Sequence, residues 1–277
     1  MILKLFFWNI WLKLSIWYKV KYKTKELKYY KKWDNKKEGW SLSFSDEFDD
    51  YKINKDIWRT DAYYGMRFHP GNIINNDKAP DVYYSDNCFD FTSTTVKLKA
   101  INSKKKVNYQ GREYEIPYQV GQLDSSQYFM QTKGYFEIRA KMPSSPGMRP
   151  AFRLASIMAL SPEIDIYEIY TGRKDGFKIM ATNVHWGTSN KKKMKHKNHK
   201  LFDLSKNFFI YGCEWTDKYL KFYFQDELIR VMKTPKDFIH PMHIIINTSV
   251  DVDNAEVAGF PNYYEVDYVR AYTKKDI

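Results

Sequence analysis

The chain has 277 residues, of which 43% are hydrophobic and 18% aromatic, and it carries a formal charge of +12. This composition excludes a disordered or collagen-like polymer and provides enough apolar area for a large core. The length predicts one or two domains, and we expect one because no linker rich in Pro, Gly or Ser divides the chain. Cys88 and Cys213 lie in apolar, strand-like stretches. These contexts favour buried free thiols, with a single bridge or a redox role as the alternative.

Residues 1–40 form a basic and aromatic N-terminal extension. A lysine precedes an apolar run there, as in a signal peptide, but Asn9 and Lys13 interrupt the run and no small-residue cleavage site follows. The run is too short to span a bilayer, so we expect no membrane span. Apolar and polar residues alternate from Trp8 to Val20. This alternation predicts one or two strands packed on the main body, residues 41–277, and an unusual export signal is the alternative.

Short runs rich in Val, Ile, Tyr, Phe and Thr recur along the rest of the chain, and no helical periodicity is sustained. The runs are, in order, WSLSFSDEF, DVYYSDNCFDF, TTVKLKAI, GYFEIRAKM, PEIDIYEIY, FKIMATNVHW, FFIYGCEW, KYLKFYFQDELIRVM, MHIIINTSV and YEVDYVRAYT. Many short strands at this spacing predict an all-β sandwich or barrel.

One stretch, NKKKMKHKNHK at residues 190–200, has no apolar face, and we predict that it forms a solvated loop. His196 and His199 lie within it, but the surrounding lysines would repel a cation, so we expect neither histidine to bind zinc. No other metal site is evident in the sequence.

The segment PEIDIYEIY, residues 162–170, places Glu163, Asp165 and Glu168 in a run otherwise typical of a buried strand. Alternate side chains of a strand share a face, so Glu163 and Asp165 point the same way. Glu168 joins them only if one extra residue is bulged out. The glutamate Cα atoms would then lie roughly 13 Å apart and their carboxyl groups about 5 Å apart, the separation of a retaining glycosidase. A solvent-facing row of acids on a half-exposed sheet is the alternative.

This strand resembles the β-bulged E-x-D-x-x-E signature of glycoside hydrolase family 16, which includes laminarinases, agarases, porphyranases and carrageenases. Other segments resemble the family in order: SLSFSDEFDD with DIWRT, the run from VGQLDSS to MRPAFRL, NVHWG, FFIYGCEWTDKYLKFYFQDELIR, IIINTSV and YEVDYVRAY. The resemblance covers about residues 41–274. It implies a concanavalin-like jelly-roll sandwich of two curved antiparallel sheets, with a sugar-binding cleft on the concave face and an extracellular or cell-surface location.

The resemblance also implies roles for individual residues. Glu163 would be the nucleophile, and Glu168 the general acid and then the general base. Asp165 would hold and tune the pair, because a neighbouring like charge helps to set which carboxyl group carries a proton. His185 falls where the family often has a cleft histidine, although a structural role is the alternative. Trp186 is either a stacking platform for a sugar ring or a core residue.

The chain departs from the family at one informative place. Many members read W-P-A-F-W ahead of the catalytic strand, whereas this chain has Arg149-Pro-Ala-Phe-Arg153. On an alternating strand Arg149 and Arg153 share a face, and two guanidinium groups suit sulfate or carboxylate. The alternative is that both arginines face solvent or pair with nearby acids. A lysine-rich loop beside the cleft would likewise gather a polyanion.

These observations predict a retaining endo-glycoside hydrolase that cleaves a β-linked polysaccharide, a sulfated or acidic galactan in particular, by double displacement. A non-catalytic carbohydrate-binding module of the same fold, a transglycosylase and a neutral β-1,3-glucanase are the alternatives. We expect a monomer without a cofactor; a structural calcium, which the family sometimes holds, has no identifiable ligands here. Because no nucleic-acid-binding signature accompanies the lysines, we expect no nucleic acid partner.

Overall fold

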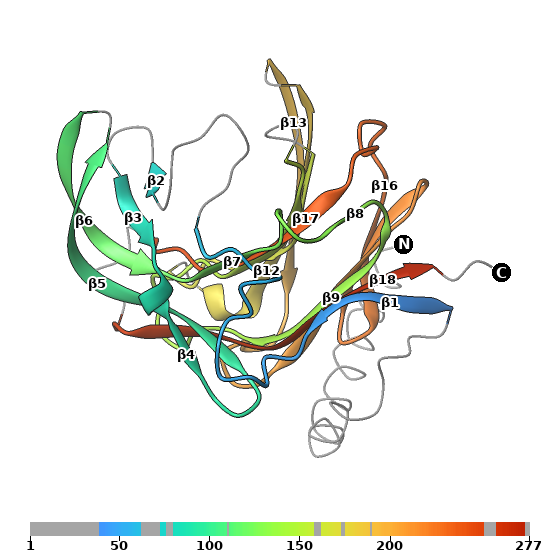
Figure 1. Cartoon of the computed structure of the whole chain (residues 1–277). Coiled ribbons are helices and arrows are strands. Elements are labelled where there is room, and N and C mark those ends of the chain that lie inside the picture. Colours follow the sequence, from blue (N-terminus) through green and yellow to red (C-terminus); the bar gives the residue numbers. More distant parts are fainter. Residues whose placement is uncertain are drawn as a thin grey trace.

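The computed structural model describes residues 39–61, 73–75, 80–109, 111–157, 162–172, 175–188, 190–251 and 259–274. Two β-sheets account for nearly all regular structure in these ranges (Figure 1), which confirms the predicted all-β sandwich. The predicted N-terminal strands, residues 1–38, lie outside the described residues. Within those same ranges there is no helix with the length and apolar character needed to cross a membrane.

The larger sheet has eleven strands in the order β16-β15-β14-β9-β18-β5-β6-β3-β2, with β1 paired to β18 and β4 paired to β5. Only the β3–β6 pair among them is parallel. The strands are β1 (Trp40–Asp46), β2 (Ile73–Asn75), β3 (Pro80–Tyr84), β4 (Phe89–Phe91), β5 (Val96–Tyr109), β6 (Arg112–Val120), β9 (Gly134–Lys141), β14 (Phe209–Trp215), β15 (Tyr219–Phe224), β16 (Glu227–Lys233) and β18 (Asn262–Lys274).

The smaller sheet has seven strands in the order β13-β12-β11-β10-β17-β7, with β8 paired to β17. The strands are β7 (Gln122–Asp124), β8 (Met130–Gln131), β10 (Ala151–Ala155), β11 (Glu163–Glu168), β12 (Ile179–Thr188), β13 (Lys191–Lys200) and β17 (Met242–Asn247). The three-acid segment is therefore β11, held between β10 and β12 near the middle of this sheet.

The hydrophobic core lies between the two sheets and fixes which way β11 faces. Ile164, Ile166 and Tyr167 point inward and are at most 1% exposed. The Tyr167 ring lies 4.4 Å from that of Tyr211 on β14, so the contact joins the two sheets. Burying one such large side chain stabilises the fold by about 1.5–3 kcal/mol. Because the apolar residues of β11 are held inward, its acids have to face outward.

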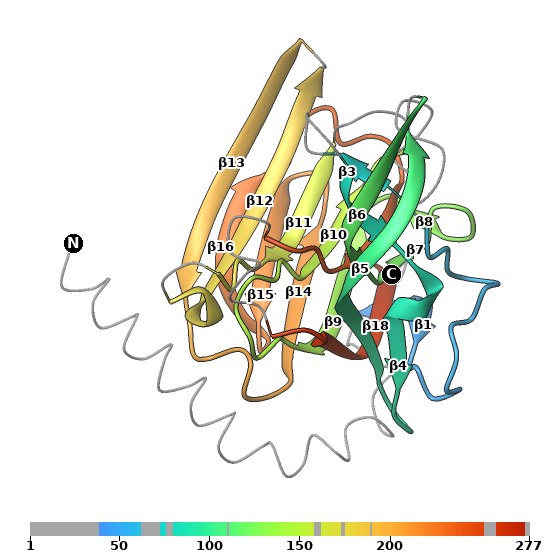
Figure 2. The same ribbon diagram turned by 90° about the vertical axis from the view of Figure 1, so that its left-hand side faces the viewer.

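The prediction of a solvated loop at residues 190–200 is wrong. Lys191–Lys200 form strand β13, which pairs with β12 over ten residues without a break. Figure 2 shows the two strands as a long hairpin that rises beyond its neighbours. The backbone hydrogen bonds to β12 form whatever the side chains are, and β13 is the edge strand of its sheet. Lysines on an edge strand discourage pairing with other chains, which explains a lysine-rich strand without an apolar face.

Both cysteines are buried and unbridged, as predicted. Cys88 ends a short 3-10 turn, Asp86–Cys88, and Cys213 lies in β14. Burial raises the pKa of both thiols, that of Cys88 to about 12. A thiol is reactive only as the thiolate, so neither group is activated.

Candidate active site

Strand β11 contains the predicted bulge. Asp165 and Glu168 are three residues apart, yet their partners on β12, Asn183 and Ala181, are two residues apart. The pairing with β10 shifts at the same place. The one extra residue on β11 shifts the alternation of side chains by one position, so Glu163, Asp165 and Glu168 all lie on the outer face of the sheet. The three side chains are 23%, 3% and 18% exposed, which excludes a simple solvent-facing row.

Arg153 on β10 lies against all three acids. Its Nη1 is 3.2 Å from Oε1 of Glu163, its Nη2 is 3.8 Å from Oε1 of Glu168, and its Nε is 3.9 Å from Oδ1 of Asp165. The arginine side chain is itself only 17% exposed. One partly buried cation therefore offsets the repulsion of three carboxylates, which would otherwise destabilise the strand.

Asp165 is the most buried of the acids and has two further partners on β12. Asn183 Nδ2 donates a hydrogen bond to its Oδ2 at 2.9 Å, and His185 Nε2 lies 3.4 Å from the same oxygen. Asn183 and His185 are two residues apart, so β12 presents both on the outer face. The aspartate is thus surrounded by donors from two neighbouring strands.

These contacts separate the protonation behaviour of the acids. Burial and the charge of Asp165 raise the pKa of Glu163 to about 8, although Arg153 opposes the rise. Burial would also raise the pKa of Asp165, but hydrogen bonding from His185 and the Arg153 charge outweigh it and lower that pKa. Hydrogen bonding to Asp165 in turn raises the pKa of His185. Glu163 and Asp165 therefore titrate as an interacting pair, in which the charge of Asp165 opposes ionisation of Glu163 and the charge of Arg153 favours it.

Glu168 has a different environment. Its Oε2 accepts hydrogen bonds from Tyr170 Oη at 2.8 Å and from Asn183 Nδ2 at 3.1 Å. Because both donors occupy Oε2, a proton carried by Glu168 belongs on Oε1, the oxygen nearest Arg153. The amide of Asn183 is oriented by His196, its cross-strand partner on β13, whose Nδ1 donates to the Asn183 Oδ1 at 2.6 Å. This contact requires the Nδ1–H form of His196.

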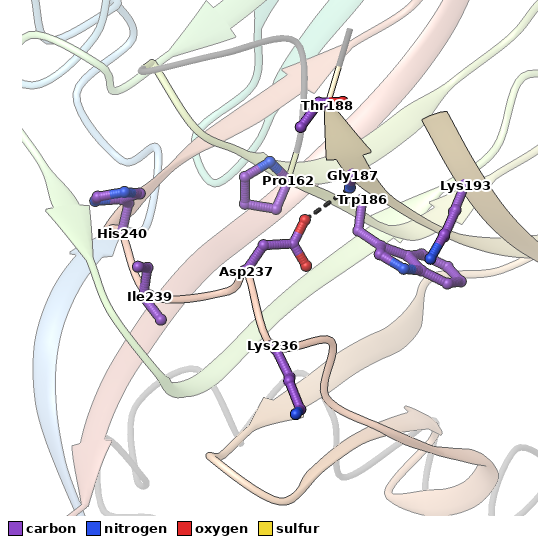
Figure 3. Close-up of a pocket in the computed structure, with 9 residues that line it drawn as sticks. All are labelled: Pro162, Trp186, Gly187, Thr188, Lys193, Lys236, Asp237, Ile239 and His240. Atoms are coloured by element: carbon purple, nitrogen blue, oxygen red, sulfur yellow. Dashed lines mark hydrogen bonds between the residues drawn. The ribbon is translucent and has the colours of Figure 1, made fainter. Parts of the chain in front are cut away.

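The other predicted site residues lie in two places. Arg149 is joined to the acids only through Tyr170: its guanidinium lies 5.0 Å from the Tyr170 ring, and its Nη2 is 3.5 Å from Oδ1 of Asp251. Trp186 follows His185 in an unbroken strand, so it points to the opposite face, where it packs against the core. There it also lines a pocket (Figure 3). The structure therefore does not place Trp186 where it could stack on a sugar beside Glu163.

Three residues near the acids were not predicted from the sequence to belong to the site, namely Tyr170, Asn183 and His196. Tyr170 ends the acidic segment, and Asn183 could have been found as the residue two before His185 on the same strand. His196 could not, because it reaches the site only through the pairing of β12 with β13. His199 lies on the opposite face of β13 and contacts Thr182, so the two histidines cannot share a metal ion. In the described part of the chain no group of three or more His, Cys, Asp or Glu side chains is placed to hold a metal.

A two-sheet jelly roll with paired glutamates on the outer face of a central strand is the architecture of a glycoside hydrolase. The family model for glycosyl hydrolases family 16 matches residues 76–270. The chain belongs to this family, and the predicted fold, family and enzyme class are confirmed.

Characterised relatives come from Rhizobium meliloti (strain 1021). The chain is 28% identical over 252 residues to the endo-1,3-1,4-beta-glycanase ExsH, covering 84% of this chain and 52% of that protein. It is 30% identical over 197 residues to the endo-1,3-1,4-beta-glycanase EglC, covering 68% and 40%. The chain thus spans about half the length of these relatives or less.

Solved structures show the same fold. The laminarinase catalytic domain from Thermotoga maritima MSB8 superposes with a TM-score of 0.68 at 23% identity, over 86% of this chain and 100% of that one. The endo-beta-1,3-glucanase from Pyrococcus furiosus gives a TM-score of 0.69 at 20% identity, over 86% and 96%.

Proposed function

We propose that the protein is a retaining, endo-acting hydrolase of a β-1,3- or mixed β-1,3-1,4-linked polysaccharide. The observation that carries the proposal is the bulged strand β11, whose three acids all lie within 4 Å of one guanidinium group. A retaining glycosidase needs one carboxylate as nucleophile and one carboxylic acid as proton donor, close together on the same side of the enzyme. The linkage is inferred from the activities named for the Rhizobium meliloti relatives.

In this proposal each residue has a defined step. Glu163 attacks the anomeric carbon while Glu168 donates its Oε1 proton to the departing glycosidic oxygen, leaving a covalent glycosyl-enzyme. Glu168, now ionised, then removes a proton from water, and the resulting attack releases Glu163. Glu163 must be ionised to begin, and Arg153 favours that form against burial and the charge of Asp165. Asn183 and Tyr170 hold the oxygen of Glu168 that does not transfer the proton.

The contacts of the two arginines bear on the substrate. The prediction of a sulfated or acidic galactan depended on Arg149 and Arg153 being available to the ligand. Arg153 instead contacts the three acids, and Arg149 contacts Asp251 and Tyr170. Because both arginines are paired, the site favours a neutral sugar at the cleaved bond, as in the neutral β-1,3-glucanase that was the alternative prediction. The acidic galactan stays a prediction, and the substrate panel described next tests it.

The experiment is a panel of laminarin, lichenan, agarose, and carrageenan in sulfated and desulfated forms, with reducing ends and product sizes measured together. We expect turnover of laminarin or lichenan with an early fall in chain length, as an endo-acting enzyme gives. Products longer than the substrate would indicate a transglycosylase. Binding without turnover would indicate a carbohydrate-binding module and overturn the proposal.

Retention is tested separately. Proton NMR of the first products should show the β-anomer before mutarotation. Glu163→Gln should abolish turnover. Glu168→Gln, assayed on an aryl β-glycoside whose leaving group departs without protonation, should regain activity in azide and yield a β-glycosyl azide. A first product with the α-configuration would refute the double displacement. We also propose that the reaction needs no cofactor, so dialysis against EDTA should leave the rate unchanged; the monomeric state stays a prediction.

A further inference from the structure

A second pocket lies behind the catalytic sheet (Figure 3). It is bounded by the end of β12, by β13 and by the segment that joins β16 to β17, and its volume is about 550 Å³. Binding sites for small ligands typically measure about 300–1,000 Å³. Trp186 lines it and points away from the face that carries His185 and Glu163. Pro162, the residue before Glu163, also lines the pocket, but none of the three acids does.

The pocket has an aromatic wall held in place by the backbone. Trp186 is half-buried, with one part packed on the core and another lining the pocket. The neighbouring Gly187 donates its N–H to Oδ2 of Asp237 at 2.7 Å, which ties the β16–β17 segment to β12. Gly187 has φ +95°, and a Cβ there would lie 2.3 Å from the Lys191 carbonyl oxygen, so the strand can turn here only with glycine. A fixed, partly exposed indole is a suitable surface for stacking a sugar ring.

Positive charge gathers around that indole. Lys193 is the cross-strand partner of Trp186, and Lys236 and His240 line the pocket from the β16–β17 segment. Lys191 and Lys195 share the face of Lys193 because alternate residues of β13 point the same way. Only Asp237 opposes them among the lining residues, and its carboxylate already accepts the Gly187 hydrogen bond.

The same alternation corrects an expectation about the lysine-rich strand. We expected a lysine-rich loop beside the cleft, with its positive charge available to a substrate chain. Lys192 and Lys200 share the face of His196, which contacts Asn183, but the other four lysines of the strand lie on the reverse face with Trp186. Most lysines of β13 thus lie on the face away from Glu163, and Lys193 is the one among them that lines the second pocket.

We propose that this pocket is a second carbohydrate-binding site, and that its ligand is a polysaccharide segment bearing carboxylate or sulfate groups. The indole of Trp186 would stack on a sugar ring while Lys193 and Lys236 contact the anionic substituent. A single aromatic wall inside a pocket suits one sugar ring, whereas a nucleic acid strand needs a continuous groove with successive stacking platforms. Such a site would hold an acidic chain on the enzyme independently of cleavage.

The test measures binding, not hydrolysis, so its outcome does not depend on the proposed function. All proteins carry Glu163→Gln to prevent cleavage. The probes are carboxymethylated, sulfated and unmodified forms of one β-glucan, together with a 15-residue oligothymidylate, compared by affinity electrophoresis at constant salt. Lys193→Glu combined with Lys236→Glu is matched by Lys192→Glu combined with Lys200→Glu. The control pair has the same change of charge, and both of its lysines lie on the opposite face of β13.

We expect the Lys193/Lys236 pair to weaken binding of at least one anionic glucan tenfold or more, and the control pair to weaken it less than threefold. The two anionic probes distinguish a carboxylate site from a sulfate site. Equal losses in the two pairs would show non-specific attraction and overturn the proposal, as would oligothymidylate binding with the same dependence on Lys193 and Lys236. Trp186→Phe should weaken binding moderately at an unchanged melting temperature, and Trp186→Ala should abolish it. Unaltered affinity in the phenylalanine and lysine variants would also refute the site.

Discussion

The role of Arg153 gives the sharpest prediction. Its Nη1 lies 3.2 Å from Oε1 of Glu163, and both side chains are less than a quarter exposed. At an effective dielectric constant of about 20, the attraction at this distance is about 5 kcal/mol. Structural relaxation and entering water weaken this attraction, so its effect on the pKa is smaller. An adjacent opposite charge commonly lowers the pKa of a carboxyl group by about 1–3 units. Arg153→Met removes that charge and keeps an unbranched side chain of comparable length.

The sign follows from the form of Glu163 that reacts. Its pKa is already raised to about 8, and Arg153 favours the ionised form. Without the guanidinium that pKa rises further, so the acid limb of the kcat/KM profile should move to higher pH by about 1–3 units. At pH 7 the rate should fall about tenfold or more, and the difference should narrow as the pH rises.

The assay is kcat/KM from pH 5 to 10 on the best substrate of the panel, with melting temperatures to confirm folding. Arg153→Lys keeps the charge and should shift the limb less. Arg149→Met is the matched control, because Arg149 contacts Asp251 and Tyr170 and not the acids. A uniform loss at every pH in Arg153→Met would refute the electrostatic reasoning, and so would an equal shift in Arg149→Met.

Three further predictions concern single contacts. Tyr170→Phe removes a donor to Glu168 and should lower kcat about tenfold or more with little change in KM, whereas unchanged kcat would show that the donor is dispensable. Burial lowers the pKa of His199 to about 3, so only the unfolded chain binds a proton at this histidine as the pH falls below about 6.5. In urea unfolding the wild type should lose about 2 kcal/mol more than His199→Gln between pH 7 and 5, and equal losses would refute a contribution from His199. Gly134 has φ +124°, and a Cβ there would lie 2.3 Å from the Tyr272 carbonyl oxygen, so Gly134→Ala should cost at least about 1–3 kcal/mol of unfolding free energy, and a smaller change would mean that the turn relaxes.

The three acids of β11 show what the local sequence pattern can predict. Alternation on β11 put Glu163 and Asp165 on one face, and the odd spacing of Glu168 meant that it could join them only through a bulge. The resemblance to a bulged family signature then favoured the bulge over a solvent-facing row. The lysine-rich strand shows the opposite case. Residues 190–200 have no apolar face, so their own pattern indicated a loop, and only hydrogen bonding to β12 makes them a strand.

The sequence by itself determined the all-β class, the family, the buried thiols and the sharing of one face by Glu163, Asp165 and Glu168, since period-two alternation and short motifs are local properties of the chain. Only the tertiary structure decided what surrounds those acids. Arg153, Asn183 and His196 come from three different strands, and their meeting depends on strand order and register. The same register turned Trp186 and most lysines of β13 to the reverse face. A shift of one residue along a strand would exchange the two faces, so the separation of the three acids from the second pocket depends on register.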